Sequence, residues 1–320
     1  MSNAVRSALV KLCELLLTAL LVSFFTFAAF SVIPGDTARV MLGPEASDEQ
    51  VEALREELGL DLPLASRYLS WLKAAGQGDF GNSLSFRTPV KELIASRLPV
   101  TLGMSLLALI MVLLVSFPVA ALCSRKPGKL TDRTLSSLGH MLFAIPPFAL
   151  SMMLILFFSK VLGIYSAGRY TKPSENFGMY IVSLLLPSLC IALPKIAMTF
   201  KFLRASMIEF ASGDFVRTAK SHGLTDLTIM IRHIIPNSAV SSVTVISLVL
   251  SDIMGGSLIV EQVFNLPGLG RLLLSAISRR DFPLLSGIVF YLAMITVILY
   301  FLSDVISALI DPRIRDGRSA

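Results

Sequence analysis

Two ionisable residues lie inside long apolar runs, where charge is rare. Asp252 lies in "LVLSDIMGGSL", and Lys195 follows Pro194 in "IALPKIAMTF". A charge at the middle of a membrane helix costs roughly 2.5–3.5 kcal/mol on insertion scales, so each residue is a candidate for lining a conduit or for a buried contact between helices. One turn after Asp252, Gly255 and Gly256 permit a close helix approach or a bend, because they lack side chains.

Catalytic chemistry is not evident in the sequence. The only Gly-Lys pair, Gly128–Lys129, precedes Leu130 and lacks the upstream glycine of a phosphate-binding loop. The three histidines stand alone, and the three cysteines lie in or beside apolar runs without metal-ligand spacing. We therefore expect no catalytic residues, no metal site and no cofactor bound by this chain.

The elements that position these candidates are membrane helices. The 320 residues are 54% hydrophobic and 16% charged, and their mean hydropathy is +0.74, whereas soluble domains carry roughly 25% charged residues. Apolar runs long enough to cross a bilayer recur along the chain. We predict an all-α fold with six spans, near residues 9–33, 99–124, 135–162, 180–203, 237–260 and 284–309.

The first run is longer than the apolar region of a signal peptide and lacks a small-residue cleavage site, so we expect a retained span. Basic residues concentrate in the loop 125–133, in 201–232 and in the tail 311–320, which places both termini in the cytoplasm. The net charge of +6 is spread over several loops and does not form one stripe, which argues against a nucleic-acid partner.

The segment 34–98 then lies outside the cytoplasm and has helical patterns. Ser47 and Gln50 form a capping box before an apolar face of Val51, Leu54 and Leu58, and Gly59 ends this helix. A second helix begins near Pro63 and places Tyr68 and Trp71 on one side, where we expect them to anchor it against the bilayer or the spans. Stacking of these rings on a substrate is the alternative.

A polar stretch, "DFVRTAKSHGLTDLTIMIRHIIP", separates the fourth and fifth spans on the cytoplasmic side. Asp214 can cap a short helix, Phe215 and Ala219 repeat on one face, and Gly223 supplies a left-handed stop. A second helix starts at Thr225 and leads through Pro236 into the fifth span. Its predicted apolar stripe is Leu227, Ile231, Ile234 and Ile235. The pattern indicates a helix held away from the membrane to dock a partner, with a solvated amphipathic loop as the alternative.

A second polar stretch, "NLPGLGRLLLSAISRRDFP", lies between two spans on the outer side and is too rich in turns to cross lipid. We expect Gly268 and Gly270 to make a tight turn after Pro267, and Leu269 to plug or line an entrance.

Residues 217–236 resemble the coupling loop of ABC importer permeases, whose pattern is Glu-Ala-Ala, three residues, Gly, nine residues, Ile-x-Leu-Pro. Ala219, Gly223 and Pro236 match this pattern, Ile235 replaces its Leu, and Arg217 and Thr218 resemble the dipeptide, oligopeptide and nickel branch. Further stretches are similar to that branch along nearly the whole chain: "VIPGD", "LGLDLPLASRYLSWL", "GDFGNSLS", "IVEQVFNLPGLGRLLLSAISRRDFP" and "LIDPRIR".

The resemblance implies a multi-pass permease in the cytoplasmic membrane of a bacterium or archaeon. Its implied partners are a second homologous permease, two ATPase subunits that hold ATP and Mg, and an extracytoplasmic substrate-binding protein. It implies an ATPase-coupling role for Asp214, Phe215, Arg217, Thr218, Ala219, Gly223 and Pro236, and an outer gate at Pro267, Gly268, Leu269 and Gly270. The candidates for the translocation path, Lys195, Asp252, Gly255 and Gly256, come from the charges within the spans.

The implied organisation is a first span in 1–33, the outer segment 34–98, a core 99–310 with coupling loop 207–236 and outer hairpin 261–283, and the tail 311–320. Peptides are the expected cargo, and nickel or a metal chelate is the alternative. A secondary transporter would need internal repeats, which the sequence does not show. A membrane enzyme would need a catalytic pair, and none is evident.

Overall fold

The computed structural model describes the backbone of residues 3–32, 37–43, 45–57, 59–163, 168 and 170–310. Side chains are described within these ranges, except for residues 3–12, 30–32, 37, 40, 41, 54, 57, 241, 244, 303, 304 and 306–310. The predicted Leu54 and Leu58 contacts and the tail 311–320 therefore lie outside the described residues.

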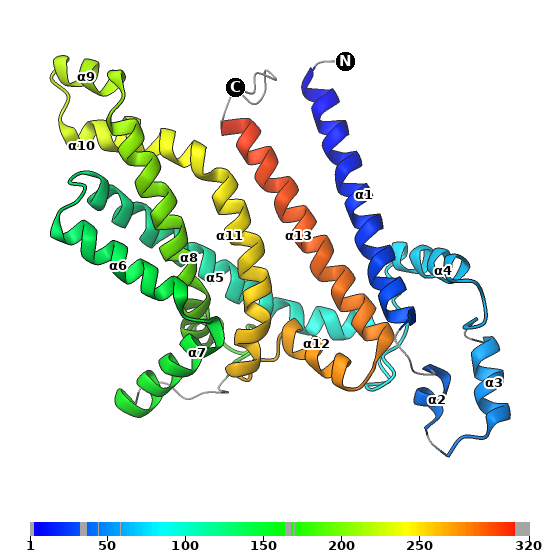
Figure 1. Cartoon of the computed structure of the whole chain (residues 1–320). Helices are drawn as coiled ribbons and strands as arrows, with labels where there is room; N and C mark the ends of the chain where they lie inside the picture. Colours follow the sequence, from blue (N-terminus) through cyan, green and yellow to red (C-terminus); the bar gives the residue numbers. More distant parts are fainter. Residues whose placement is uncertain are drawn as a thin grey trace.

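Helices dominate the described chain, as predicted (Figure 1). Within its ranges the sole β pairing is an isolated bridge between Asn82 and Pro89. The helices are α1 (Asn3–Val32), α2 (Thr37–Leu42), α3 (Asp48–Glu57), α4 (Leu64–Gly76), α5 (Val90–Ser124), α6 (Leu130–Ala144), α7 (Pro147–Leu156), η1 (Phe157–Val161), α8 (Phe177–Ala211), α9 (Asp214–Ser221), α10 (Asp226–Ile229), η2 (Met230–Ile234), α11 (Ile235–Val263), α12 (Leu269–Ser278) and α13 (Phe282–Ile310).

Among the described residues, four helices are long and apolar enough to cross a membrane: Val90–Ser124, Phe177–Ala211, Val245–Val263 and Phe282–Leu302. The pair formed by α6 and the helix after it is a fifth if it counts as one span. In α1 the part with described side chains, Cys13–Ala29, is a shorter apolar helix. The structure thus gives four to five spans by this measure, and the sixth stays a prediction.

The predicted third span, 135–162, is wrong as a single helix. Leu130–Ala144 and Pro147–Val161 are bent by 106° relative to each other. Ile145 and Pro146 each precede a proline and both adopt extended ψ angles, 123° and 141°. A proline disfavours the helical conformation of the residue before it, so two consecutive prolines break the helix here.

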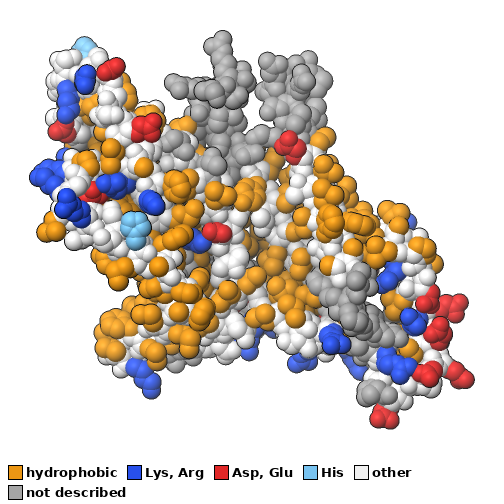
Figure 2. Space-filling view, in the orientation of Figure 1, with side chains coloured by type: hydrophobic (Ala, Val, Ile, Leu, Met, Phe, Trp, Pro, Cys, Tyr) orange, Lys and Arg blue, Asp and Glu red, His pale blue; other side chains and the backbone are white. Residues whose placement is uncertain are grey.

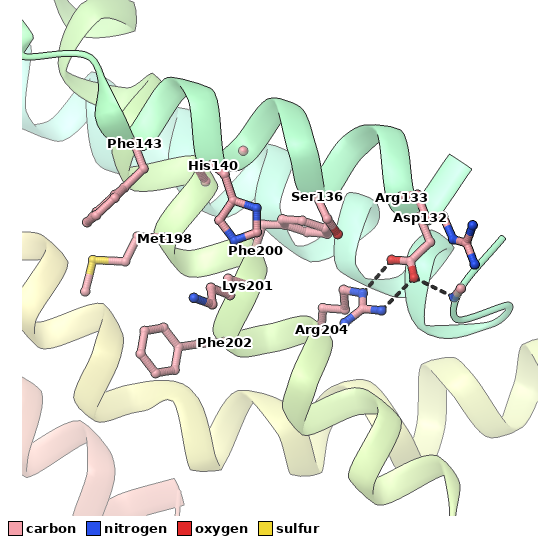
Figure 3. A pocket seen from close by; sticks show the side chains of 13 residues that line it. Asp132, Arg133, Ser136, His140, Phe143, Met198, Phe200, Lys201, Phe202 and Arg204 are labelled. Atoms are coloured by element: carbon pink, nitrogen blue, oxygen red, sulfur yellow. Dashed lines mark hydrogen bonds and ion pairs between the residues drawn. The ribbon is translucent and has the colours of Figure 1, made fainter. Parts of the chain in front are cut away.

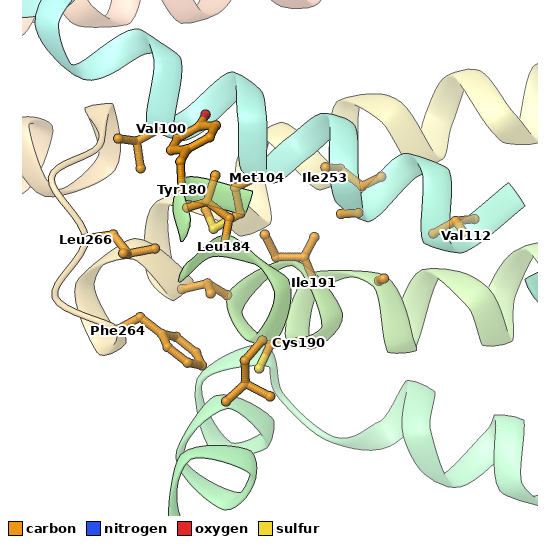
Figure 4. Packing of buried hydrophobic residues seen from close by; sticks show 14 of the residues in the cluster. Val100, Met104, Val112, Tyr180, Leu184, Cys190, Ile191, Ile253, Phe264 and Leu266 are labelled. Atoms are coloured by element: carbon orange, nitrogen blue, oxygen red, sulfur yellow. The ribbon is translucent and has the colours of Figure 1, made fainter. Parts of the chain in front are cut away.

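The central core lies where α5, α8 and α11 meet (Figure 4). Met104, Leu184 and Ile253, one from each helix, are fully buried in it. Tyr180 donates a hydrogen bond of 2.7 Å to the carbonyl of Pro99. A Cβ on Gly103 would lie 2.0 Å from this tyrosine oxygen, so glycine allows α5 and α8 to approach closely.

The outer segment folds as its sequence predicts and packs on the spans. Ser47 and Gln50 form the reciprocal capping box, with distances of 3.1 and 3.3 Å. Tyr68 stacks edge-on against Phe24 of α1 and exchanges a 2.8 Å hydrogen bond with Ser23. Trp71 contacts Phe290 of α13. The sequence predicted that these rings anchor α4 against the bilayer or against the spans, and the structure shows contacts with the helices α1 and α13.

The beginning of α1, the end of α13 and the short helix α9 lie at one end of the molecule (Figure 1). Hydrophobic side chains cover the sides of the helices, whereas charged side chains gather around α9 and the neighbouring end of α6, and around α2 to α4 (Figure 2). This distribution matches a bundle with an apolar belt between two polar ends.

Candidate functional site

The helix α9 stands beyond the end of α8 and turns back through Gly223, which has the predicted left-handed conformation with φ +77°. Its inner face is formed by Val216 and Ala219, which are buried against Leu203 and Met207 of α8. The prediction that Phe215 and Ala219 share the inward face is therefore wrong. The residue that faces inward with Ala219 is Val216, three positions earlier, and not Phe215, four positions earlier. Phe215 is 39% exposed.

The predicted cap at Asp214 is also wrong. Gly213 occupies the N-cap position without a side-chain hydrogen bond, and Asp214 is the first helical residue. Asp214 lies 3.7 Å from Arg217, and both side chains are largely exposed. Thr218 is exposed as well. The outer surface of α9 thus combines one aromatic ring with charged and hydroxyl groups.

The second helix of this loop starts at Thr225, as the sequence predicts. The Thr225 hydroxyl caps it by accepting a hydrogen bond of 3.3 Å from the Thr228 amide. The predicted apolar stripe is only partly correct. Ile234 is buried, but Leu227 and Ile231 are 55% and 56% exposed. Ile229 and Met230 are buried in place of these two residues. The π turn η2 begins at Met230, and its wider turn changes the register from there onward. Pro236 lies in the first turn of α11, as predicted.

Lys195 and Asp252, which the sequence offered as separate candidates, form an ion pair between α8 and α11. The Lys195 Nζ lies 2.7 Å from Asp252 Oδ2. The Lys195 side chain is 18% exposed and that of Asp252 is 58% exposed. Each charge of the pair neutralises the other within the apolar part of the bundle. The Asp252 carboxylate nevertheless stays accessible on the side away from Lys195.

Gly255 and Gly256 continue α11 without a break, and a Cβ on either would meet nothing within 4 Å. Among the described residues no close helix contact depends on these glycines, so that alternative is wrong, and the bend stays a prediction. They leave an open, side-chain-free surface on α11 one turn beyond Asp252.

The outer hairpin is built around the buried carboxylate of Glu261. It accepts hydrogen bonds from the Thr101 hydroxyl at 2.6 Å and from the Gly270 amide at 2.6 Å, at the beginning of α12. A Cβ on Gly268 would lie 2.2 Å from this carboxyl group, and one on Gly270 would lie 2.4 Å from the Leu258 Cα. Both glycines are thus required for close packing and not for the predicted tight turn.

Leu269 is fully buried in the cluster formed with α5 and α13. In this conformation its side chain is part of the core, and the role of Leu269 at an outer entrance stays a prediction. Pro267 is partly buried beside it. The turn itself uses Asn265, which has φ +57°.

A family model described as the binding-protein-dependent transport system inner membrane component matches residues 116–316, and its N-terminal companion matches residues 5–105. The chain belongs to this family. It is a permease of the ABC importers, of the peptide group.

Two named relatives are similar in sequence to this permease over almost its whole length. A probable peptide ABC transporter permease, y4tP of Sinorhizobium fredii, is 32% identical over 92% of this chain and 94% of that protein. The glutathione transport system permease GsiC of Escherichia coli K12 is 33% identical over 95% of this chain and 97% of that protein. Membership of this family excludes the membrane enzyme and the self-contained secondary transporter as readings of the sequence.

The MetNI methionine ABC transporter, solved in inward-facing conformations, shares the fold of the permease. Its matching chain has a TM-score of 0.56 at 17% identity, and the match covers 68% of this chain and 96% of that chain. The likeness shows that the helices are arranged as in a known ABC importer permease.

Sequence reasoning missed three buried carboxylates of the permease. Besides Glu261, Asp281 is fully buried and accepts a 2.9 Å hydrogen bond from the Ser85 amide, joining the outer segment to the start of α13. Asp132 binds Arg204 between α6 and α8, with Oδ2 2.6 Å from Nη2. The signal for Asp281 was its place just before the apolar run that starts at Phe282. Nothing in the sequence signalled the partner of Asp132.

Proposed function

We propose that this permease forms half of the path of an ATP-driven peptide importer in the cytoplasmic membrane of a bacterium or archaeon. A second, related permease supplies the other half. Two ATPase subunits that hold ATP and Mg bind the end of the molecule that carries α9, and a substrate-binding protein binds the opposite, outer end. We place both termini in the cytoplasm in this arrangement, since the beginning of α1 and the end of α13 lie at the end that carries α9 (Figure 1).

Peptides are the proposed cargo. The two relatives described above are named for peptide and glutathione transport, and glutathione is itself a peptide. These names favour peptides over the alternative of nickel or a metal chelate.

The observation that carries the coupling proposal is the two-sided placement of α9. Val216 and Ala219 attach this helix to the buried cluster at the end of α8, while Phe215 stays 39% exposed on a different side. A helix held in this way moves with α8 as one body. A force applied to Phe215 by an ATPase is therefore transmitted along the same helix that carries Lys195.

The proposed mechanism follows from this connection. ATP binding draws the two ATPases together and moves the two copies of the coupling helix, one in each permease. The attached spans then rock between inward-open and outward-open states, which is a rigid-body shift between two conformations. The Lys195–Asp252 pair joins α8 to α11, so we assign it and the open surface at Gly255 and Gly256 to the wall of the path.

Substitution of Phe215 by aspartate tests the coupling role. Burial of this ring in an ATPase groove contributes about 1.5 kcal/mol, because the ring is already partly covered, and its loss weakens ATPase binding roughly tenfold. The measurement is co-purification of the ATPase subunits with the tagged permease. Phe215→Leu, which keeps an apolar side chain, is the matched control and retains most of the binding.

The yield and helix content of the Phe215→Asp permease are expected to be unchanged, since the ring lies outside the buried clusters. Normal ATPase recovery and normal peptide uptake with this variant would refute the assignment of α9 as the docking helix.

A further inference from the structure

A cavity of about 500 Å³ opens between α6 and α8, on the side of the molecule that carries the charged end of α6 (Figure 3). We call it the α6–α8 cavity. Six of its lining residues carry the argument: Arg133, His140, Phe143, Met198, Lys201 and Phe202. Its volume lies within the roughly 300–1,000 Å³ that is typical of pockets for small molecules.

The side chains along the α6–α8 cavity change in character from one end to the other. Figure 3 shows Phe143, Met198 and Phe202 at one end, and Lys201 and His140 across the middle. The linked Asp132 and Arg204 lie at the opposite end, close to the loop that precedes α6. A ligand that fits this arrangement has an apolar part and a polar part of a defined charge.

The sign of that charge follows from the pairing of the lining groups. Asp132 is the acidic member of the described lining residues, and its carboxylate already binds Arg204 and the Gly128 amide. Lys201 and Arg133 have no acidic partner among the described residues. The cavity therefore presents two uncompensated positive charges, which favour an anionic ligand.

The α6–α8 cavity borders the face of α8 that carries the Lys195–Asp252 pair, because Met198 and Phe202 of its lining lie on that face, whereas Lys201 lies about 120° around the helix from Lys195. Lys195, Met198 and Phe202 are spaced by three and four residues, so they form one stripe on the helix. With a rise of 1.5 Å per residue, Lys201 lies about 9 Å farther along the helix axis than Lys195. A cargo that passes the ion pair toward the end that carries α9 next meets Met198 and Phe202, at the edge of the cavity.

We propose that the α6–α8 cavity binds the carboxylates of peptide cargo and makes the permease favour small peptides with net negative charge. Lys201 binds the carboxylate, Arg133 adds to the positive potential, and Phe143, Met198 and Phe202 contact apolar side chains of the peptide. The Lys195–Asp252 pair is neutral and contributes no such preference. This inference rests on the proposed function, because it requires that the path extends from the face of α8 with Lys195 around the helix to Lys201.

The test is ATP-driven uptake by the complete importer, reconstituted in vesicles, with the dipeptides Ala-Glu and Ala-Gln as probes. The measured quantity is the ratio of their uptake rates. The same binding protein delivers both dipeptides to every variant, so its own preference cancels when ratios are compared between variants. Lys201→Gln is expected to lower the Ala-Glu to Ala-Gln ratio about threefold, the order of effect of one partly exposed charge pair.

Three variants accompany Lys201→Gln. Lys201→Arg keeps the charge and is expected to retain the original ratio. Arg133→Gln removes the second charge and lowers the ratio by a smaller factor, and it provides the test if Lys201→Gln does not assemble. Lys126→Gln removes the same charge from an exposed loop residue outside the cavity lining, and it leaves the ratio unchanged.

An unchanged ratio in Lys201→Gln and Arg133→Gln, with normal Ala-Gln uptake, would overturn the inference and leave the proposed function intact. If these variants also lose co-purified anionic phospholipid, the cavity is a lipid headgroup site and the inference is equally overturned. Failure of the unmodified importer to take up either dipeptide would instead contradict peptide import itself.

Discussion

Two ion pairs on α8 show how the same chemistry serves different purposes. Lys195 pairs with Asp252 of α11, and Arg204 pairs with Asp132 of α6. The Asp132 side chain is 3% exposed and also accepts a 2.7 Å hydrogen bond from the Gly128 amide. The Asp252 side chain is 58% exposed and has a single described partner, Lys195.

The difference lies in how completely each carboxylate is satisfied. Both carboxylate oxygens of Asp132 accept hydrogen bonds from the guanidinium of Arg204, and one also accepts a hydrogen bond from the Gly128 amide in the loop before α6. These contacts fix α6 against α8. Asp252 keeps an open side, and the ammonium of Lys195 is a compact charge on a flexible stem that can exchange partners. We conclude that the first pair is a structural lock, and that the second is suited to contact a passing ligand.

The largest predicted effect is on the locked pair. Asp132→Asn removes the charge that Arg204 needs and is expected to destabilise the chain by about 3 kcal/mol, the lower end of the range for breaking a buried pair, because Arg204 is partly exposed. Thermal unfolding of the purified permease in detergent, followed by circular dichroism, measures this loss. Asp214→Asn is the matched control, because its partner Arg217 and its own carboxylate are exposed.

A melting temperature of Asp132→Asn equal to that of Asp214→Asn would show that the buried pair does not hold α6 in place. The conclusion that the Asp132–Arg204 pair has a structural role would then be wrong.

A smaller effect on stability is predicted for the open pair. Asp252→Asn should change the free energy of unfolding by at most about 1 kcal/mol, as expected for a solvent-accessible ion pair. Peptide uptake by the complete importer should nevertheless fall, because in the proposed arrangement the wall of the path then carries the uncompensated charge of Lys195. A loss of stability as large as that of Asp132→Asn would make both pairs structural and would remove Asp252 from the path.

Local signals in the sequence predicted local structure well. The capping box of Ser47 and Gln50, the stop at Gly223 and the helix start at Thr225 each depend on residues within three or four positions of one another. Such contacts can be read from sequence, because helix geometry fixes which neighbours meet. The family itself was predicted from motifs that are spread along the chain, and it is confirmed.

Contacts between helices could not be read in the same way. Asp252 and Lys195 were each identified by the cost of a charge in lipid, but their pairing depends on how α8 and α11 cross. Gly268 and Gly270 were assigned to a turn, whereas the buried carboxylate of Glu261 and the backbone of Leu258 explain them. The face of α9 was wrong because tertiary packing selected Val216 in place of Phe215.

The most direct test of the account is chemical access to position 252 in the assembled importer. The exposed Cys13 is first replaced by serine, and Asp252 is then replaced by cysteine. The native Cys123 and Cys190 serve as internal controls, because they are 1% and 0% exposed. The probe is a charged thiol reagent that does not cross membranes, applied without nucleotide and again with ATP trapped on the complex.

The account predicts that the cysteine at position 252 reacts, that the rate changes when ATP is trapped, and that peptide cargo slows the reaction, while Cys123 and Cys190 do not react. No reaction at position 252 in either nucleotide state would contradict the central claim that this open ion pair lines the path.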